Sequence, residues 1–202
     1  MLPITINLKK RKCIIVGGGK IAYRRTKTLL AEGAHLVVIS PELLPELAVL
    51  VEKKRVDWLP RTFEKQDTRD AFLVVAATNK REVNAAVAQS CSPNQLINIA
   101  DDPENSSFYF PAVGRRGLLS VAVGTDGASP ILAKNIRNEI MSQFDETYEL
   151  YFAFVKISRE KILHLQIEET EKRQLLTEIV DKKYLDIRLQ RAFLEQLKKK
   201  QR

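Results

Sequence analysis

Residues 13–22 of the chain read Cys-Ile-Ile-Val-Gly-Gly-Gly-Lys-Ile-Ala. An apolar, β-branched run ends at three glycines and a helical pattern begins directly after them, so the stretch predicts a strand, a tight turn and a helix. Gly17, Gly19 and Ala22 match the G-x-G-x-x-G/A spacing of dinucleotide-binding turns. Gly19 would leave room for a pyrophosphate, and the first N–H groups of the helix would face it. A glycine-rich turn that binds no ligand is the alternative.

Length and composition place the chain among soluble globular proteins. It has 202 residues, of which 45% are hydrophobic and 29% charged. We expect no membrane partner, because no apolar run approaches the roughly 18 residues of a membrane span and the start lacks signal-peptide features. Cys13 and Cys91 are expected to be free thiols in a reducing cytoplasm. Without a C-x-x-C motif or a histidine cluster, we predict no metal site.

The chain is basic, with a formal net charge of +8 at pH 7. Such an excess is compatible with nucleic acid, a membrane surface or an acidic small molecule as partner. The surplus is spread along the chain, and its one dense cluster, Lys198–Arg202, is expected to be a frayed terminus. A diffuse surplus favours an acidic small molecule. Nucleic-acid binding ranks last because no reader motif is recognisable.

Strand-like and helix-like segments alternate over residues 1–112. The predicted strands are Ile4–Leu8, Lys12–Val16, His35–Ile39, Val56–Leu59, Leu73–Ala76 and Leu96–Ile99. The predicted helices are Ile21–Glu32, Pro41–Lys54 and Lys80–Cys91. This alternation is typical of a doubly wound parallel sheet, whose ligands bind at the carboxyl ends of the strands. We therefore predict an α/β, Rossmann-like domain with its site in the loops after those strands.

The next segment predicts a hairpin and a helix. Phe108–Pro111 and Leu118–Gly124 are strand-like, and Gly114–Gly117 would join them. Ser129-Pro130 suits the N-cap and the first position of a helix that runs to about Phe144.

From residue 146 onward the sequence is almost entirely helix-forming. We divide the chain into a Rossmann-like domain over residues 1–112, a small domain over 113–145 and a helical C-terminal domain over 146–202. The hairpin and the apolar stripes of the helices are hard to bury within a single chain, so we predict a homodimer.

Several strings of residues together carry a family resemblance that covers residues 2 to about 140. They are Leu2-Pro3-Ile4, Val16–Gly19, Ala76-Ala77-Thr78, Val83-Asn84, Asn98–Pro103, Phe108–Ala112, Ser129–Lys134 and Ile136-Arg137. With these strings the chain resembles the precorrin-2 dehydrogenase family, also found as the N-terminal module of siroheme synthases. The resemblance implies NAD-dependent oxidation of precorrin-2 to sirohydrochlorin, in siroheme or cobalamin biosynthesis. It also implies an acidic tetrapyrrole substrate and a homodimer in which residues 113–145 form the dimerisation domain.

The predicted cofactor is NAD. The residues expected to bind it are Gly17, Gly18, Gly19, Lys20, Ile21, Ala22, Ser40, Pro41, Glu42, Thr78 and Asn79. A Rossmann site for NAD expects an acid near the end of the second strand, and Glu42 is the nearest carboxylate there. Glu42 could instead be a residue of the first helical turn, favoured by the helix dipole. No Arg or Lys follows in that loop to bind a 2′-phosphate, so NAD is favoured over NADP.

Asp101 is the predicted catalytic residue. Removing a hydride and a proton from the substrate needs a base, and Asp101 is expected at a strand end facing the cleft. It also matches the aspartate that matters in the family. His35 begins a strand and His164 lies in the tail, so both are poorly placed for this role. The alternative is that Asp101 is a turn residue, since Asp101-Asp102-Pro103 is also good turn chemistry.

Four basic residues are candidates for binding the substrate carboxylates: Arg115, Arg116, Lys134 and Arg137. For each of them the alternative is an ordinary solvated surface. Two further function classes stay open. One is a bifunctional dehydrogenase that also inserts iron or cobalt, and the other is a regulatory domain that senses NAD without turnover.

Overall fold

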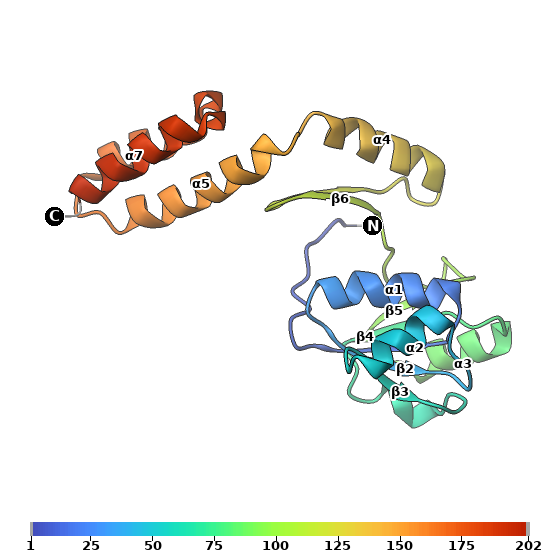
Figure 1. Ribbon diagram of the computed structural model, residues 1–202. Helices are drawn as coiled ribbons and strands as arrows, with labels where there is room; N and C mark the ends of the chain where they lie inside the picture. The colour runs from blue at the N-terminus through green and yellow to red at the C-terminus, as the bar shows by residue number, and fades with distance from the viewer. Residues whose placement is uncertain (1, 201–202) are drawn as a thin grey trace. The chain divides into compact units, whose positions relative to one another are not determined.

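The computed structural model describes residues 2–200 (Figure 1). The chain forms two compact units, one up to Phe110 and one from Pro111 onward. The further division of the second unit into domains at residue 145 stays a prediction. None of the helices within residues 2–200 is both long and apolar enough to cross a bilayer.

The first unit is built on a five-stranded parallel sheet with the order β3-β2-β1-β4-β5. Its strands are β1 (Lys12–Val16), β2 (His35–Ile39), β3 (Asp57–Leu59), β4 (Leu73–Ala76) and β5 (Leu96–Ile99). Its helices are α1 (Lys20–Ala31), α2 (Pro45–Glu52), the 3-10 turn η1 (Lys65–Thr68) and α3 (Arg81–Ser90). The strand order reverses between β1 and β4, as in other doubly wound sheets. The predicted Rossmann-like α/β fold is confirmed.

The two faces of the sheet bury alternate residues of the same strand. Cys13 and Ile15 of β1 pack into a cluster with α1 and α2, whereas Ile14 and Val16 pack into a second cluster with α3. Full burial of one such aliphatic side chain contributes about 1.5–3 kcal/mol. Because both faces are covered, the strands read as continuous apolar runs, which is why four of them have the predicted bounds.

Two strands predicted in this unit are wrong. Residues 4–8 form no strand, because Ile6 and Leu8 pack onto the apolar cluster that contains α1 and so do not pair at a sheet edge. The segment predicted as strand 108–111 follows Ser106 and Ser107, whose hydroxyls accept the N–H groups of Ile99 and Ile97 (2.8 and 2.9 Å). The backbone N–H of Ser107 also donates to the carbonyl of Ile97 (2.8 Å), so this stretch covers the β5 edge through side-chain and backbone bonds without forming a regular ladder.

The helix after β2 begins at Pro45, four residues later than predicted. The N–H of Leu44 donates to the carbonyl of Gly18 (2.8 Å), so residues 41–44 form a loop against the glycine turn. Pro45 then occupies the first helical position, which its missing N–H and fixed φ favour.

The second unit opens with an antiparallel hairpin, β6 (Ala112–Arg116) and β7 (Leu119–Val123). The register pairs Arg116 with Leu119, so the turn is Gly117-Leu118. The predicted second arm is confirmed to within one residue at each end, whereas the predicted first arm and turn are wrong. Gly117 has φ +51°, which suits a tight hairpin turn and explains the shorter connection. Arg115 and Arg116 therefore lie in a strand.

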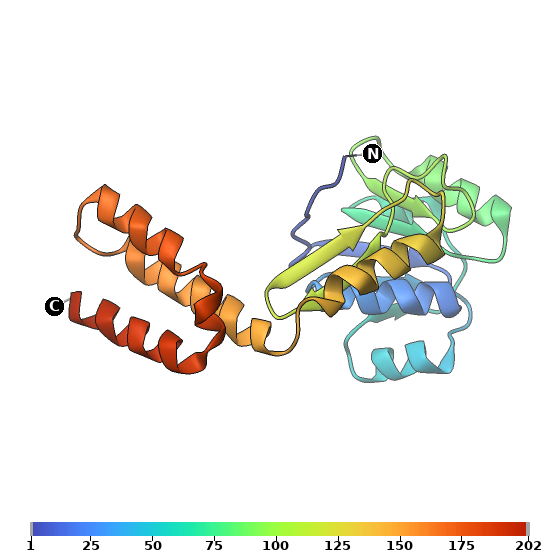
Figure 2. The ribbon, with the colours of Figure 1, turned by 90° about the horizontal axis from the view of Figure 1, so that it is seen from above.

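Helix α4 (Pro130–Ser142) lies along this hairpin (Figure 2). Its predicted start is confirmed, because the Ser129 hydroxyl accepts the N–H of Leu132 (3.1 Å). Gly114 lets α4 approach β6, since a Cβ there would lie 2.4 Å from the Met141 side chain.

The remaining elements pack side by side as a small helical core. They are α5 (Thr147–Leu163), α6 (Glu169–Glu178), the 3-10 turn η2 (Lys182–Leu185) and α7 (Ile187–Lys200). Lys198–Lys200, expected in a frayed terminus, form the last turn of α7, where Lys198 pairs with Glu195. Gln201 and Arg202 lie outside the described residues.

We expect Gly17→Ala to lower the free energy of unfolding by about 2 kcal/mol or more. Gly17 has φ +122°, and a Cβ there would lie 2.3 Å from the carbonyl oxygen of Ala77. Gly19→Ala is the matched control, because its Cβ would meet no described atom within 4 Å. Urea unfolding followed by circular dichroism measures both variants. Equal midpoints for the two would contradict the role of Gly17.

Candidate active site

The loops after β1, β2, β4 and β5 meet at the carboxyl edge of the sheet. They contain Gly17–Gly19, Ser40–Leu44, Ala77–Lys80 and Ala100–Asp102. The glycine turn follows β1, next to the point where the strand order reverses. This is the place where open α/β sheets bind ligands.

The glycine turn has the shape of an anion cradle. Gly19 is the N-cap of α1 and, as glycine, offers no side chain to cap the helix. The N–H groups of the first turn, from Lys20 to Ala22, are thus available to an anion at the positive end of the helix dipole. A Cβ on Gly19 would meet no described atom within 4 Å, whereas Ala22 is fully buried against the sheet. The turn therefore fits a dinucleotide pyrophosphate.

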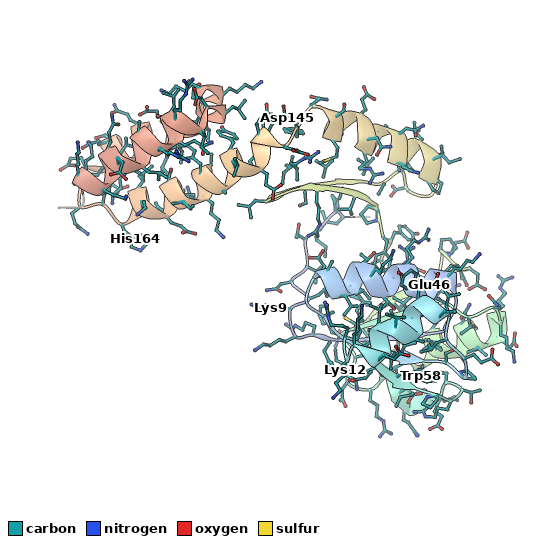
Figure 3. All side chains as sticks on the ribbon, in the orientation of Figure 1. Lys9, Lys12, Glu46, Trp58, Asp145 and His164 are labelled. Atoms are coloured by element: carbon teal, nitrogen blue, oxygen red, sulfur yellow. The ribbon has the colours of Figure 1, made fainter. Side chains whose placement is uncertain are left out.

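The loop after β2 is bonded to β3 on one side and to the glycine turn on the other. The indole N–H of Trp58 on β3, which is labelled in Figure 3, donates to the carbonyl of Ser40 (2.9 Å). The N–H of Leu44 donates to the carbonyl of Gly18 (2.8 Å). A Cβ on Gly18 would lie 2.0 Å from the carbonyl oxygen of Glu42, so the backbones touch. Glu42 is exposed and precedes α2, whose first-turn acid is Glu46, so the interpretation of Glu42 as a helical residue is wrong.

Asp101 faces the amide of Asn84. The Asn84 side chain, 1% exposed on the first turn of α3, donates to Asp101 Oδ1 (2.7 Å) and to the carbonyl of Thr78 (3.1 Å). Its Oδ1 accepts the Thr78 N–H (3.1 Å). A single buried amide therefore joins the loop after β4 to the loop after β5. Asn79, beside Thr78, is exposed.

An open hollow of about 380 Å³ lies beside this amide. Its lining residues are Arg81, Asn84, Ala85, Ala88, Gln89, Ile99, Asp101, Asp102 and Asn105. The Asp101 carboxylate is exposed to this hollow while one of its oxygens is held by Asn84.

The neighbouring Asp102 has a different role. Its carboxylate accepts both the side-chain amide (2.7 Å) and the backbone N–H (3.2 Å) of Asn105. These hydrogen bonds, the side-chain bond first, lower the pKa of Asp102. Asp102 thus stabilises the loop up to Asn105. Asp101 itself lies in the turn after β5, where the Asp102 N–H donates to the carbonyl of Ile99 (3.4 Å), so its alternative role as a turn residue stays open.

The histidines and the cysteines lie outside this group of loops. His35 is at the amino end of β2, where its Nε2 is 2.8 Å from Asp57 Oδ2, and His164 follows α5 in the second unit (Figure 3). Cys13 and Cys91 are free, and burial raises the pKa of each thiol to about 11. Among residues 2–200 no three His, Cys, Asp or Glu side chains are grouped closely enough to hold a metal ion.

The four basic candidates belong to the second unit and differ in their surroundings. Arg137 donates from Nη1 to the carbonyl of Val113 (2.8 Å), and Arg116 donates from Nε to the carbonyl of Phe144 (3.2 Å). Both side chains therefore help to hold the hairpin against the helices that follow it. Arg115 and Lys134 are exposed.

Sequence reasoning assigned no role to Asn84. One feature of the sequence could have indicated a role for Asn84: it places an amide on the buried face of α3, one turn after the loop that contains Thr78. A polar side chain at a buried position needs partners, and here those partners come from two separate loops.

Three family models together match most of the chain. A model described as NAD(P)-binding matches residues 4–112, one described as sirohaem biosynthesis protein central matches 116–143, and one described as SirC C-terminal domain matches 148–193. The first covers the sheet and the glycine turn.

Named relatives match along much of their length. A precorrin-2 dehydrogenase of Priestia megaterium is 38% identical over 200 residues, which cover 98% of this chain and 99% of that protein. A precorrin-2 dehydrogenase of Bacillus subtilis (strain 168) is 43% identical over 145 residues, or 72% of this chain and 90% of that protein. The solved structure of SirC, precorrin-2 dehydrogenase, has a TM-score of 0.87 at 36% identity and covers 98% of this chain and 100% of that chain.

We expect Gly19→Asp to weaken NAD binding by at least about tenfold, which corresponds to about 1.4 kcal/mol, while the fold is retained. The new carboxylate would occupy the open space at the end of α1 and repel a pyrophosphate. Gly124→Asp in the second unit is the control, since it adds the same charge at a position that is also open. Isothermal titration calorimetry measures affinity, and circular dichroism checks the fold. Unchanged affinity in Gly19→Asp would rule out the glycine turn as the pyrophosphate site.

Proposed function

The chain belongs to the precorrin-2 dehydrogenase family, and we propose that it oxidises precorrin-2 to sirohydrochlorin with NAD. The observation that carries this proposal is the match to a named dehydrogenase over 98% of the chain. Siroheme biosynthesis is the pathway that the family models indicate, and cobalamin biosynthesis uses the same chemistry. The relatives that match along most of their length are named as dehydrogenases, which favours turnover over NAD sensing.

The reaction removes two electrons and two protons from precorrin-2. NAD, when bound, accepts a hydride, and one proton remains to be taken by the protein or by solvent. The chain's own tasks are therefore to hold two ring systems together and to receive that proton.

We assign these tasks to the loops at the carboxyl edge of the sheet. Gly17–Ala22 would bind the pyrophosphate through backbone N–H groups. Glu42 would bind the adenosine ribose, while Ser40, Pro41, Thr78 and Asn79 would line the cofactor site. The exposed carboxylate of Glu42 would also repel a 2′-phosphate, which supports NAD over NADP.

Asp101 would accept the proton. It is exposed to the hollow, and only one of its oxygens is bonded to Asn84, so the other is open to a substrate. The acidic rim of the tetrapyrrole would be bound by Arg115, Arg116, Lys134 and Arg137. We place the enzyme in the cytoplasm, where Cys13 and Cys91 stay reduced.

The test of the activity is to mix the protein with precorrin-2 and NAD and to record NADH absorbance and the sirohydrochlorin spectrum together. A parallel sample with NADP measures cofactor preference. Adding Fe²⁺ or Co²⁺ after the oxidation shows whether the protein also accelerates metal insertion over the metal and product alone. No NADH above the sample without precorrin-2 would contradict the dehydrogenase assignment.

We expect Asp101→Asn to lower the rate of NADH production by about a hundredfold to ten-thousandfold, the usual contribution of a general base. The substitution keeps the shape of the side chain and removes its basicity. NAD affinity should change little, because Asp101 is not assigned a contact with the cofactor. Asp102→Asn is the control, since that carboxylate bonds Asn105 within its own turn. Turnover within about threefold of the parent in Asp101→Asn would mean that solvent takes the proton.

We also propose a homodimer formed through the hairpin and α4. Apolar side chains are exposed on these elements, including Leu118 (58%), Ile131 (74%) and Leu132 (50%). The apolar stripes of the C-terminal helices, by contrast, are mostly buried within this chain: Ile179, Phe193 and Leu197 pack with Phe154, while Val180 and Leu189 are exposed. Exposed apolar groups of this kind are typical of subunit contacts.

Light scattering should give about twice the 23.0 kDa mass of the chain. Ile131→Asp should shift the protein toward the monomer, because it places a charge among the exposed apolar groups of α4. Ile187→Asp on α7 is the control, with a comparable change at an exposed position outside the proposed interface. A parent protein that is a monomer at micromolar concentration would overturn the dimer.

A further inference from the structure

We propose that Asn84 is a positioning residue that orients Asp101 and couples it to the loop containing Thr78 and Asn79. The inference rests on the proposed function, because Asn84 affects the reaction only if Asp101 accepts the proton. The juxtaposition that carries it is one buried amide bonded to both loops.

The orientation of the Asn84 amide follows from its partners. A backbone N–H can only donate, so the atom 3.1 Å from the Thr78 N–H must be the oxygen. The Thr78 carbonyl can only accept, so the amide nitrogen must face it at 3.1 Å. Rotating the amide by half a turn would place donor against donor and acceptor against acceptor. Thr78 thereby fixes which end of Asn84 faces Asp101.

Because the nitrogen is fixed, its second hydrogen points to Asp101 Oδ1 at 2.7 Å. This bond holds an exposed carboxylate, which would otherwise sample several rotamers, in a single orientation. The other carboxylate oxygen stays open toward the hollow. No further side chain is therefore needed to orient the Asp101 carboxylate.

The coupling reaches the proposed cofactor site. Thr78 and Asn79 are assigned to the cofactor, and Asn84 holds Thr78 by its N–H and its carbonyl. A displacement of this loop would move the amide and, with it, Asp101. The proton acceptor and one wall of the cofactor site therefore keep a fixed relative position.

The decisive variant is Asn84→Asp, which keeps the size of the side chain and the acceptor for Thr78. It removes the donor to Asp101 and to the Thr78 carbonyl, and it places a second negative charge beside Asp101. We expect kcat to fall by about tenfold to a hundredfold, with a smaller change in the KM for precorrin-2. The acid limb of the kcat profile should move to higher pH, because the two carboxylates repel each other. A limb that stays in place would contradict direct contact between the side chain at position 84 and Asp101.

Asn94→Asp is the matched control, because it makes the same amide-to-carboxylate change at an exposed position before β5 that does not line the hollow. Its profile should superimpose on that of the parent. If Asn84→Asp fails to fold, Asn84→Ala removes the donor without adding charge, and a loss of kcat in the same range is expected. A rate equal to the parent in the folded variant, alongside a strongly impaired Asp101→Asn, would overturn the proposal.

A second readout needs no turnover. In the cofactor-free protein, the side-chain amide protons of Asn84 should change chemical shift with pH in the parent and not in Asp101→Asn. Shifts that do not respond to pH in the parent would overturn the contact. If the parent fails to oxidise precorrin-2, the proposed function is wrong, while this titration still decides whether Asn84 holds Asp101.

Discussion

Direct backbone contact between the glycine turn and its two neighbouring loops is the constraint on which the site depends. Gly17 lies against Ala77, and Gly18 lies against Glu42, with no room for a Cβ at either position. The loops after β2 and β4 are thereby fixed relative to the first turn of α1. Gly19, which makes no such contact, is left as the open position of the turn. The close backbone contacts at Gly17 and Gly18 fix the loops beside the turn, and Gly19 leaves the space that a pyrophosphate would occupy.

Hydrogen bonds also fix Asp101, the proposed proton acceptor, relative to these loops. The loop after β5 is anchored at its far end by the hydroxyls of Ser106 and Ser107, which accept N–H groups of β5 itself. Asn105 ties Asp102 within that loop, and Asn84 ties Asp101 to the loop after β4. Asp101 is therefore held by neighbours whose own positions are fixed, which is what a reacting group needs to keep its geometry.

The sequence pattern is enough to predict the buried strands and the glycine turn. It fails where the packing or hydrogen-bond partners of a residue come from distant segments of the chain. A strand such as β1 is buried on both faces, so its apolar run between Lys12 and Gly17 marks its limits. Residues 4–8 are also strand-like, with alternating apolar side chains, but Ile6 and Leu8 pack onto the cluster that contains α1, and no local pattern records that. Asn84 was missed for a related reason. Its meaning depends on Asp101, seventeen residues away, and on a loop that only the folded sheet brings beside it.

The four basic candidates show how a structural and a functional role can coincide in one side chain. Arg116 lies near Asp145, whose pKa is lowered first by the hydrogen bond from the Thr147 hydroxyl and also by this guanidinium. Arg137 donates instead to the neutral carbonyl of Val113, and its stem fits against Gly114. A guanidinium bonded to a carbonyl is fixed in place but keeps its full positive charge. Arg137 is thus a pre-oriented cation, so its part in packing the hairpin strengthens its candidacy for binding a substrate carboxylate.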